Sequence, residues 1–400
     1  MNAGRVCVRA ACDPEAPEFI ALLRALSEEF AATAADYDRH AAFPHANLAR
    51  LHATGLLALT VPRALGGAGA SLERARQVVQ AVARGEPSTA LVLTMQYLIH
   101  RRLQVHPRWP PALRRRLAQE AVRDGALVNA LRVEPELGTP ARGGLPATLA
   151  CRDDGHWRIS GRKLYSTGIP GLTWLNVWAR SDDPVPQVGY WLVHRDTPGI
   201  HVVESWDHLG MRASCSHTVV LEDVRVPLAH AVDVRSVDAP PEPDDAEDML
   251  WMVVLLATIY DAVAGAARDW FAGWLQRRAP SNLGSALATL PRFEQLLGRI
   301  DALLLSNRVL LDCAAQGRLQ VSEAGLLKHL VTRQAIEAVE LAVEAAGNPG
   351  LDCANPLQRH YRDVLCARIH APQDDMLLGG AGRAAFARLA AMAGEGVDGN

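Results

Sequence analysis

The chain opens with apolar side chains that recur every three or four positions, which is the period of one face of an α-helix. These residues are Phe19, Leu22, Leu23, Leu26 and Phe30. Ser71 and Pro87 are residue types that favour the first turn of a helix, so we expect further helices to begin near them. The pattern therefore predicts an N-terminal helical domain over residues 1–125.

From about residue 127 the pattern changes to short runs rich in β-branched and aromatic residues, separated by turn-forming residues. Such runs are typical of β-strands. The predicted strands cover residues 127–131, 156–160, 174–179, 190–194 and 217–221. We therefore expect a middle β-domain over residues 126–232.

A proline- and acid-rich segment, residues 239–245, is expected to form a linker after the strands. Long Ala- and Leu-rich stretches then predict helices over about 248–275, 291–315 and 322–346. We expect residues 233–400 to form a C-terminal helical bundle domain. The order of helices, strands and helices predicts the α+β fold class.

The composition excludes some partners. The net charge is −3 and only 21% of the residues are charged, with no block of like charge, so nothing favours nucleic acid as a partner. The longest apolar run, residues 250–260, is about half of what a bilayer requires, so no membrane partner is expected. A small-molecule substrate remains the natural expectation for such a chain.

Seven scattered cysteines without a C-x-x-C pair are typical of free thiols in a reducing compartment, and we expect a cytoplasmic protein. The chain reaches Asp13 and Glu15 before any apolar run develops, which does not fit a signal peptide. The fourteen histidines include no H-x-x-x-H pair near a glutamate, so no metal site is expected.

Two segments of the β-domain carry the candidate chemistry. The first, residues 133–140, reads Val-Glu-Pro-Glu-Leu-Gly-Thr-Pro, and the second, residues 161–168, reads Gly-Arg-Lys-Leu-Tyr-Ser-Thr-Gly. Each leaves a β-rich run for a turn, so we expect both to offer backbone N–H groups and small hydroxyls to one cleft. Either segment alone is an ordinary turn or strand.

Together with two further segments, they resemble the acyl-CoA dehydrogenase superfamily. That family has a Glu-Pro-x-x-Gly-Ser turn followed by a Gly-x-Lys-x-(aromatic)-x-Thr strand. Residues 209–214, Leu-Gly-Met-Arg-Ala-Ser, and the Val-Pro at 226–227 resemble its later β-domain segment. Residues 61–69 resemble the turn after its second helix. The four motifs occur in the family's order and cover most of the chain.

No Rossmann-type glycine fingerprint is present, but the resemblance implies a flavin cofactor that is bound in another way. The cofactor is FAD or alternatively FMN, because residues 279–281, Ala-Pro-Ser, replace the Phe-Gly that should follow Arg278 at the adenosine end. It implies that the flavin lies between the β-domain and a four-helix C-terminal bundle, and that the protein is a homo-oligomer, expected to be a tetramer. The implied cofactor-binding residues are Tyr165 against the ring, Thr167 near N5 with Ser166 between them, Gly138 and Thr139 in the first turn, Ser214 near the phosphates, and Arg278 toward the adenosine end.

The C-terminal region departs from the dehydrogenases. Aligned from Arg362 and Asp363, Ala371 stands where they have the catalytic Glu that removes the α-proton of a thioester. The alternative base position falls on Trp251 or Met252. A displaced base stays open, and the nearby carboxylates are Glu247, Asp248, Asp374 and Asp375.

The segment around His370 instead resembles the flavin monooxygenases of this superfamily, such as dibenzothiophene monooxygenase, where a histidine is catalytic. An imidazole that titrates near neutral pH is a suitable proton donor in oxygenation. The alternative is a histidine at a helix end that satisfies backbone carbonyls.

Three hypotheses follow. The first is a two-component monooxygenase that takes reduced flavin from a flavin reductase, with His370 as proton donor. The second is an FAD-dependent acyl-CoA dehydrogenase with a displaced base, which passes electrons to an electron-transfer flavoprotein. The third is a non-catalytic scaffold, against which the retained Tyr165 and Thr167 argue.

Overall fold

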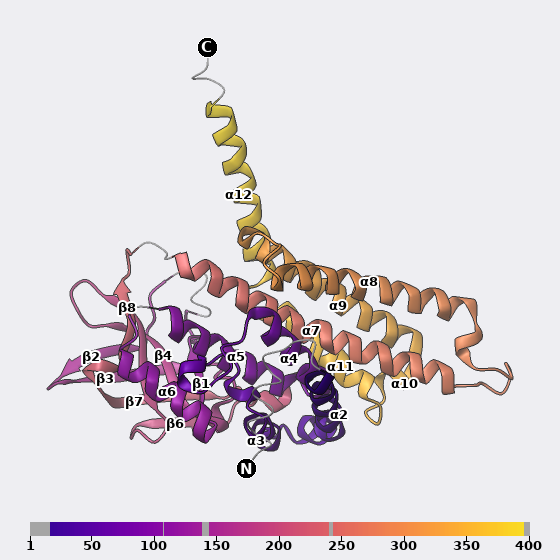
Figure 1. The fold of residues 1–400 in the computed structure, drawn as a ribbon, viewed down its shortest axis with the longest axis horizontal. Helices are drawn as coiled ribbons and strands as arrows, with labels where there is room; N and C mark the ends of the chain where they lie inside the picture. Colours follow the sequence, from indigo (N-terminus) through magenta and orange to yellow (C-terminus); the bar gives the residue numbers. More distant parts are fainter. Residues whose placement is uncertain (1–16, 107, 138–143, 240–242, 396–400) are drawn as a thin grey trace. The chain divides into compact units, whose positions relative to one another are not determined.

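The computed structural model describes residues 17–106, 108–137, 144–239 and 243–395. Figure 1 shows the path of the chain, which divides into two compact units, Met1–Asp248 and Met249–Asn400. Each unit is described by itself below. The fold class is α+β, as predicted from the order of the elements.

The first unit begins with helices. They are α2 (Pro17–His40), α3 (His45–Ala53), α4 (Leu72–Gly85), α5 (Pro87–Val105) and α6 (Pro111–Asp124). The predicted starts at Ser71 and Pro87 are confirmed: Ser71 caps α4 by accepting a hydrogen bond from the N–H of Arg74, and Pro87 is the first residue of α5. The helix α2 buries Phe19, Leu26 and Phe30 against α4.

The strands of this unit form one eight-stranded sheet. They are β1 (Leu127–Leu131), β2 (Leu149–Asp153), β3 (His156–Lys163), β4 (Leu172–Ser181), β5 (Gln187–His194), β6 (Ile200–Val203), β7 (Thr218–Pro227) and β8 (Ala231–Ser236). Their order is β6-β7-β3-β2-β4-β5-β8, and β1 pairs with β4. The pairs β1–β4 and β2–β4 are parallel and the others are antiparallel.

All five predicted strands are present, but β2, β6 and β8 were not predicted. The strand β6 has four residues, and His201, Val202 and Val203 are all exposed, so no burial pattern marks it. β2 and β8 mix polar and apolar residues over five or six positions. Such short, half-polar segments carry little periodicity, and it is their pairing with neighbouring strands that makes them part of the sheet.

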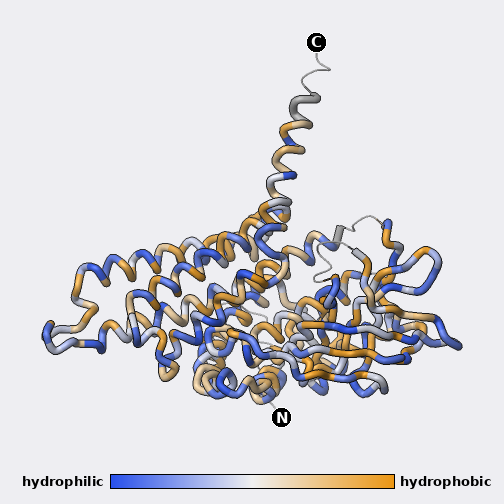
Figure 2. The backbone as a smooth tube through the Cα atoms, turned by 180° about the vertical axis from the view of Figure 1, so that it is seen from behind, coloured by the Kyte–Doolittle hydropathy of each residue, from blue (hydrophilic) through white to orange (hydrophobic). Residues whose placement is uncertain are grey.

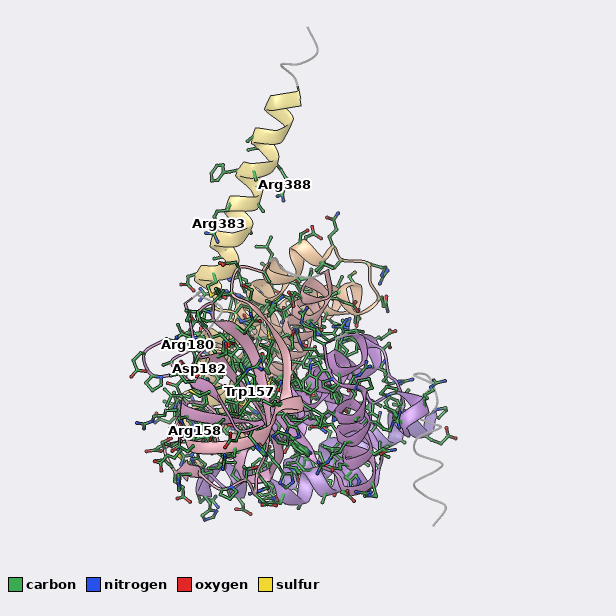
Figure 3. The ribbon with its side chains drawn as sticks, turned by 90° about the vertical axis from the view of Figure 1, so that its left-hand side faces the viewer. Trp157, Arg158, Arg180, Asp182, Arg383 and Arg388 are labelled. Atoms are coloured by element: carbon green, nitrogen blue, oxygen red, sulfur yellow. The ribbon has the colours of Figure 1, made fainter. Side chains whose placement is uncertain are left out.

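Apolar side chains fill the space between the sheet and the helices α5 and α6. The buried members of this cluster are Ile99, Leu103, Trp109, Leu113, Leu117, Val128, Trp174, Tyr190, Leu192 and Val232. Figure 2 shows how hydrophobic and hydrophilic positions interleave along the strands and helices. On β3, Trp157 is buried while its neighbour Arg158 is exposed, which is the alternation that a strand imposes (Figure 3).

The second unit is helical. Its elements are most of α7 (Pro243–Arg277), then α8 (Pro291–Ala315), α9 (Ala324–Ala346), α10 (Asn348–Leu351), α11 (Pro356–Leu365) and α12 (Asp374–Glu395). The helix α9 packs against α8, α11 and α12. Buried Asn307 of α8 donates hydrogen bonds to Asp261 Oδ1 of α7, at 2.9 Å, and to the carbonyl of Val331 in α9, at 3.2 Å. This amide joins three helices of the unit.

The predicted start of α7 was wrong by about one turn. The helix begins at Pro243 rather than near residue 248, and so takes up part of the expected linker. Proline is favoured in the first turn of a helix, and acidic residues there interact well with the positive end of the helix dipole. The proline- and acid-rich composition that suggested a linker is equally suited to a helix start.

By length and composition, residues 245–277 of α7 are apolar enough to cross a membrane. However, 78% of the apolar window is buried within the structure, as expected for the core helix of a folded domain. The helix α12, on which Arg383 and Arg388 are labelled in Figure 3, also carries exposed apolar side chains, with Phe386 exposed by 75% and Leu389 by 64%.

Candidate functional site

The two β-domain segments singled out in the sequence lie side by side. The N–H of Leu164 donates to the carbonyl of Val133 at 2.9 Å, which closes a bridge between them. Lys163 Nζ lies 2.5 Å from Glu134 Oε1, and both side chains are almost completely buried. Gly138 and Thr139 fall outside the described residues. The predicted meeting of the two segments is confirmed up to that turn.

The carboxylate of Glu134 organises the start of the turn. It accepts hydrogen bonds from the N–H groups of Ala147 and Thr148 and from the Thr148 hydroxyl, in addition to Lys163. Burial alone would raise the pKa of Glu134, but the hydrogen bonds from Lys163 and Thr148 outweigh it and hold the pKa below its ordinary value. Burial lowers the pKa of Lys163 to about 8, against the opposing effect of Glu134.

The turn after β3 is fastened to the segment before β7. The N–H of Ser166 donates to the carbonyl of His217 at 3.1 Å, and the N–H of Gly168 donates to the carbonyl of Ser214 at 2.9 Å. Tyr165 and Cys215 have positive φ values of 54° and 42°. Side-chain-bearing residues rarely adopt this conformation, and such strain is often found at functional sites.

The strained turn presents Tyr165 to the outside, where the side chain is 54% exposed. Its ring stands edge-on to Trp206 and His208, with ring centroids 6.3 Å and 5.9 Å away. The Trp206 and His208 rings are themselves stacked at 3.7 Å. Tyr165 therefore belongs to a supported aromatic surface in this unit.

A chain of hydroxyl groups joins the turn after β3 to the segment before β7. Ser214 Oγ lies 2.9 Å from Ser216 Oγ, and Ser216 donates to Thr167 Oγ1 at 3.0 Å. The backbone at Thr167 is held as well, because the amide of Asn129 donates to its carbonyl at 3.0 Å. Ser166 Oγ is buried and has no hydrogen-bond partner among the described residues. The structure thus brings Thr167, Ser214 and Ser216 together through their hydroxyls, two residues from Tyr165.

These groups fit a flavin. A half-exposed aromatic ring would cover a flat ring system, and the hydroxyl of Thr167 would meet a ring nitrogen or oxygen. The hydroxyl of Ser166 can bind a ligand, because it is buried and has no hydrogen-bond partner among the described residues. A bound flavin would supply electron transfer, and the protein residues would supply orientation and hydrogen bonds.

In the second unit, His370 follows a short turn after α11 and is partly buried. Its Nδ1 lies 2.8 Å from the hydroxyl of Tyr260 in α7. The ammonium of Lys328 in α9, which is fully buried, donates to the carbonyls of His370 and Pro372 at 2.9 Å and 2.8 Å. Two helices therefore fix the ring and the backbone of this histidine. The ring pairs with a phenol rather than with the backbone carbonyls of a helix end.

The expectation that His370 titrates near neutral pH does not fit its surroundings. Burial, helped by the positive charge of Lys328, lowers the pKa of His370 to about 4. Burial raises the pKa of Tyr260 well above its ordinary value, so the phenol keeps its proton. The imidazole is therefore neutral at physiological pH, and it can act as a hydrogen-bond donor through a ring N–H without carrying a charge.

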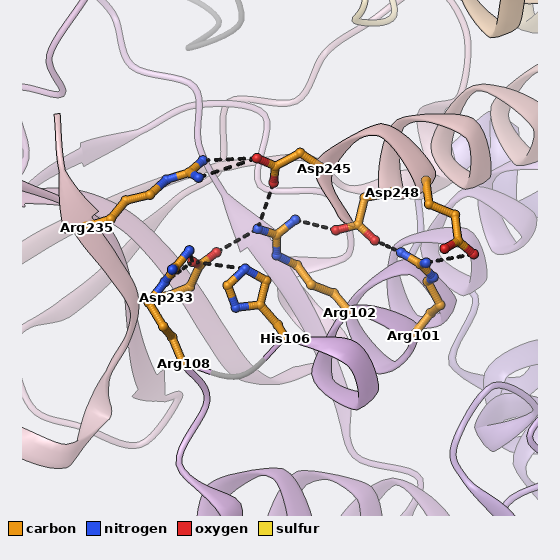
Figure 4. Close-up of polar contacts among 9 residues, drawn as sticks. Arg101, Arg102, His106, Arg108, Asp233, Arg235, Asp245 and Asp248 are labelled. Atoms are coloured by element: carbon orange, nitrogen blue, oxygen red, sulfur yellow. Dashed lines mark hydrogen bonds and ion pairs between the residues drawn. The ribbon is translucent and has the colours of Figure 1, made fainter. Parts of the chain in front are cut away.

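Three of the four carboxylates considered as displaced bases lie close to a basic side chain. Arg101 pairs with Glu247 at 2.8 Å and with Asp248, and Arg102 also pairs with Asp248. Figure 4 shows Arg102 between Asp233, Asp245 and Asp248, in a network that ties α5 and β8 to the first turns of α7. In the second unit, Asp374 lies 3.0 Å from His329 Nδ1.

Arg278 lies just past the end of α7, and its side chain is exposed. Its N–H donates to the carbonyl of Trp274, and its own carbonyl accepts from the N–H of Leu287. These backbone bonds hold the connection toward α8. The expected role of Arg278 at the adenosine end of the cofactor stays a prediction.

Sequence reasoning missed the supporting residues. Ser216, Asn129, Tyr260 and Lys328 each contact a predicted residue, yet none belongs to a recognisable motif. The two last come from helices 42 or more positions away in the chain, so spacing alone could not find them. Only Ser216 could have been suggested by the sequence, because it lies two positions after Ser214 and directly before the strand predicted at 217–221.

Three family models match the chain in consecutive order. The N-terminal, middle and C-terminal domains of acyl-CoA dehydrogenase match residues 14–103, 132–224 and 261–374. YdbM of Bacillus subtilis, assigned as an acyl-CoA dehydrogenase, is 32% identical over 88% of this chain and 92% of its own length. The protein therefore belongs to the acyl-CoA dehydrogenase superfamily, and it is a flavin-dependent oxidoreductase of that superfamily.

Other relatives are named as nitrososynthases rather than as dehydrogenases. The L-evernosamine nitrososynthase of a Micromonospora species is 29% identical over 91% of this chain and 89% of that protein. The structure of KijD3 in complex with FMN and a dTDP-linked amino-keto sugar matches with a TM-score of 0.81 and 26% identity, over 97% of this chain and 94% of that one. The superfamily, the α+β fold and the flavin that the sequence predicted are thus confirmed.

Proposed function

We propose that the protein is the oxygenase component of a two-component flavin monooxygenase, which takes reduced flavin from a separate flavin reductase. Within it, His370 acts as the hydrogen-bond donor at the reacting oxygen. The observation that carries this proposal is the engagement of His370 by Tyr260 and Lys328, together with Ala371 at the dehydrogenase base position. An alanine cannot accept a proton, whereas a held neutral imidazole can donate a hydrogen bond.

The state of the alternative bases supports the same reaction. A carboxylate that removes a weakly acidic α-proton needs a raised pKa and a free approach to its substrate. Glu247 and Asp248 instead face Arg101 and Arg102. Asp374 faces His329. These contacts occupy the carboxylates, so none of the three is free to approach the α-carbon of a substrate.

Tyr260 and Lys328 prepare His370 for its task. We assign the phenol of Tyr260 as the donor to Nδ1, which lies 2.8 Å away. The proton of the neutral ring is then on Nε2, and this N–H is the group available to a reactant. Lys328 holds the carbonyls on both sides of Ala371, so the ring cannot shift with the backbone. The catalytic group is then fixed in both tautomer and position before the substrate arrives.

In the first unit, Tyr165, Ser166 and Thr167 would contact the flavin ring. Gly138 and Thr139, which lie outside the described residues, are proposed cofactor-binding residues as well. FMN is the cofactor to try first, because it is the flavin in the KijD3 complex, while FAD is the choice that the dehydrogenase relatives suggest. Ser214 would support this contact from beneath rather than meet a phosphate, since its side chain is fully buried and its hydroxyl pairs with Ser216.

For the substrate, we propose a small polar molecule that is oxygenated on a heteroatom. Relatives named as amino sugar nitrososynthases, from Streptomyces and Micromonospora species, make nucleotide-linked amino sugars the first compounds to test. We further propose a homotetramer in the cytoplasm. The domain boundaries at residues 125 and 232 stay predictions.

The second candidate is an acyl-CoA dehydrogenase that transfers electrons to an electron-transfer flavoprotein. The 32% identity to YdbM favours it. The test is anaerobic titration of the protein, loaded with oxidised FAD or FMN, with acyl-CoA thioesters of short, medium and long chains. A monooxygenase keeps its yellow absorbance with all of them. Rapid bleaching by any one thioester would overturn the proposed function and establish the dehydrogenase.

A further inference from the structure

The hydroxyl of Ser216 connects two parts of the first unit that are far apart in the sequence. It donates to Thr167 Oγ1, which follows β3, and lies 2.9 Å from Ser214 Oγ, which precedes β7. We propose that Ser216 is a positioning residue for the flavin: it occupies an acceptor site of Thr167 and thereby directs the single hydroxyl proton of Thr167 outward, toward the cofactor. This inference rests on the proposed contact between Thr167 and the flavin.

The number of hydroxyl protons on Ser214, Ser216 and Thr167 determines the direction in which Thr167 donates. A hydroxyl has one proton to donate and two lone pairs to accept with. Because Ser216 donates to Thr167, its own oxygen is free to accept from Ser214, and Thr167 must send its proton to a third group. In a flavin, O4 accepts hydrogen bonds in both the oxidised and the reduced state, and N5 accepts in the oxidised state. A Thr167 hydroxyl whose proton points outward is therefore a suitable donor to them.

Burial makes the arrangement persistent. Ser214 is fully buried and Ser216 is 3% exposed, whereas Thr167 is partly exposed. Bulk water therefore has little access to the inner two hydroxyls, and they must satisfy each other. The surrounding backbone bonds from Ser166 to His217 and from Gly168 to Ser214 keep the two segments in register. The outward side of Thr167 is the one left for a ligand.

The same geometry explains why Ser216 need not touch the flavin to affect it. Without the Ser216 hydroxyl, the proton of Thr167 can turn inward to the vacated space or toward Ser214. The Thr167 hydroxyl then donates to the flavin for only part of the time. Loss of one neutral hydrogen bond typically weakens binding by about three- to tenfold. A role in packing alone would not depend on whether Thr167 has a hydroxyl.

The experiment is a double-mutant cycle on flavin affinity. Purified full-length protein is titrated with FMN and with FAD, and binding is followed by quenching of flavin fluorescence. The variants are Ser216→Ala, Thr167→Val and the two combined. Ser205→Ala is the matched control, because Ser205 pairs with Thr218 at 2.8 Å in the same region but does not contact Thr167. Thermal unfolding of each apoprotein reports whether the variant is folded.

We expect Ser216→Ala to raise the flavin Kd about three- to tenfold, and Thr167→Val to raise it at least as much. In the Thr167→Val background, the Ser216 substitution should change the Kd less than about twofold, because its effect passes through the Thr167 hydroxyl. Ser205→Ala should bind flavin as the unmodified protein does.

Two other results overturn the inference and are distinct from each other. If Thr167→Val weakens flavin binding while Ser216→Ala does not, or if the two effects simply add, Ser216 does not act through Thr167. If Thr167→Val leaves the affinity unchanged, the proposed flavin contact of Thr167 itself fails, and the role of Ser216 fails with it.

Discussion

Lys163 Nζ and Glu134 Oε1 form a buried ion pair at 2.5 Å that joins the two motifs of the β-domain. Lys163 also donates to the carbonyl of Trp178 on β4, and Glu134 also binds the backbone of Ala147 and Thr148. The pair therefore fixes the end of β3 to the turn that begins at Glu134. The residues that follow Lys163, which we propose contact the flavin, take their position from this anchor.

Replacing one partner of this pair should destabilise the protein strongly. Glu134→Gln leaves the ammonium of Lys163 buried without its counter-charge, and we expect a loss of about 3–5 kcal/mol in the free energy of unfolding. Urea unfolding followed by circular dichroism measures it. The control is Asp153→Asn, which removes a partner of the exposed pair with Arg225 and should cost less than about 1 kcal/mol. Equal costs for the two variants would contradict the anchoring role.

Removing the carboxylate of Asp248 should reduce stability and leave turnover in place. The side chain of Arg101 is only 8% exposed, and together with Arg102 it would lose a charged partner in Asp248→Asn. We expect a cost on the order of 2 kcal/mol in the free energy of unfolding, with kcat within about threefold of the unmodified protein. Complete loss of turnover in a folded Asp248→Asn protein would instead identify Asp248 as the base.

The lowered pKa of His370 predicts a specific dependence of stability on pH. Between about pH 6.5 and 4 the unfolded chain binds a proton at this position and the folded protein does not. The free energy of unfolding therefore falls as the pH is lowered through this window. His100, whose burial also lowers its pKa to about 4, contributes in the same direction.

His370→Asn isolates the contribution of His370, because asparagine does not titrate. The free energy of unfolding should fall less steeply between pH 6.5 and pH 4 in this variant. Over the whole window, its total decrease should be smaller by about 1–3 kcal/mol than in the unmodified protein. Urea unfolding at half-unit pH intervals provides the comparison. Identical slopes for the two proteins would show that His370 titrates normally in the folded state.

Tyr260→Phe should change the behaviour of His370 without removing it. The variant loses the hydroxyl that lies 2.8 Å from Nδ1, so the imidazole proton is free to occupy either nitrogen. We expect kcat to fall by about 10- to 100-fold, with flavin affinity unchanged. Nitrogen-15 NMR of labelled histidine reports the tautomer, and a fixed Nε2–H form in Tyr260→Phe would contradict the role of the phenol.

The sequence predicted the elements that have a strong period and missed those that depend on partners. The helices α8 and α9 begin and end within two residues of the expected bounds, because their apolar faces are long. The edge strand β6 could not be found, since three of its four residues are exposed. The start of α7 was misplaced because its acidic first turn resembles a linker in composition.

The candidate site was predicted in the same uneven way. Tyr165, Thr167 and Ser214 belong to motifs that the sequence shows, and in the structure Ser216 links Thr167 to Ser214. The environment of His370 could not be predicted, because its low pKa depends on burial and on Lys328, which is distant in the chain. Gly138 and Thr139 lie outside the described residues, and the role of Arg278 stays a prediction.

The most direct test of the proposed reaction is to reduce the flavin-loaded protein without oxygen and then mix it rapidly with oxygenated buffer while recording its absorption spectrum. We expect a transient absorbing species that forms before oxidised flavin appears, and that decays faster when the substrate is present. In His370→Asn this species should still form, but its decay should not be accelerated by the substrate and no oxygenated product should appear. Direct, slow reoxidation without a transient species would contradict the monooxygenase and favour the dehydrogenase.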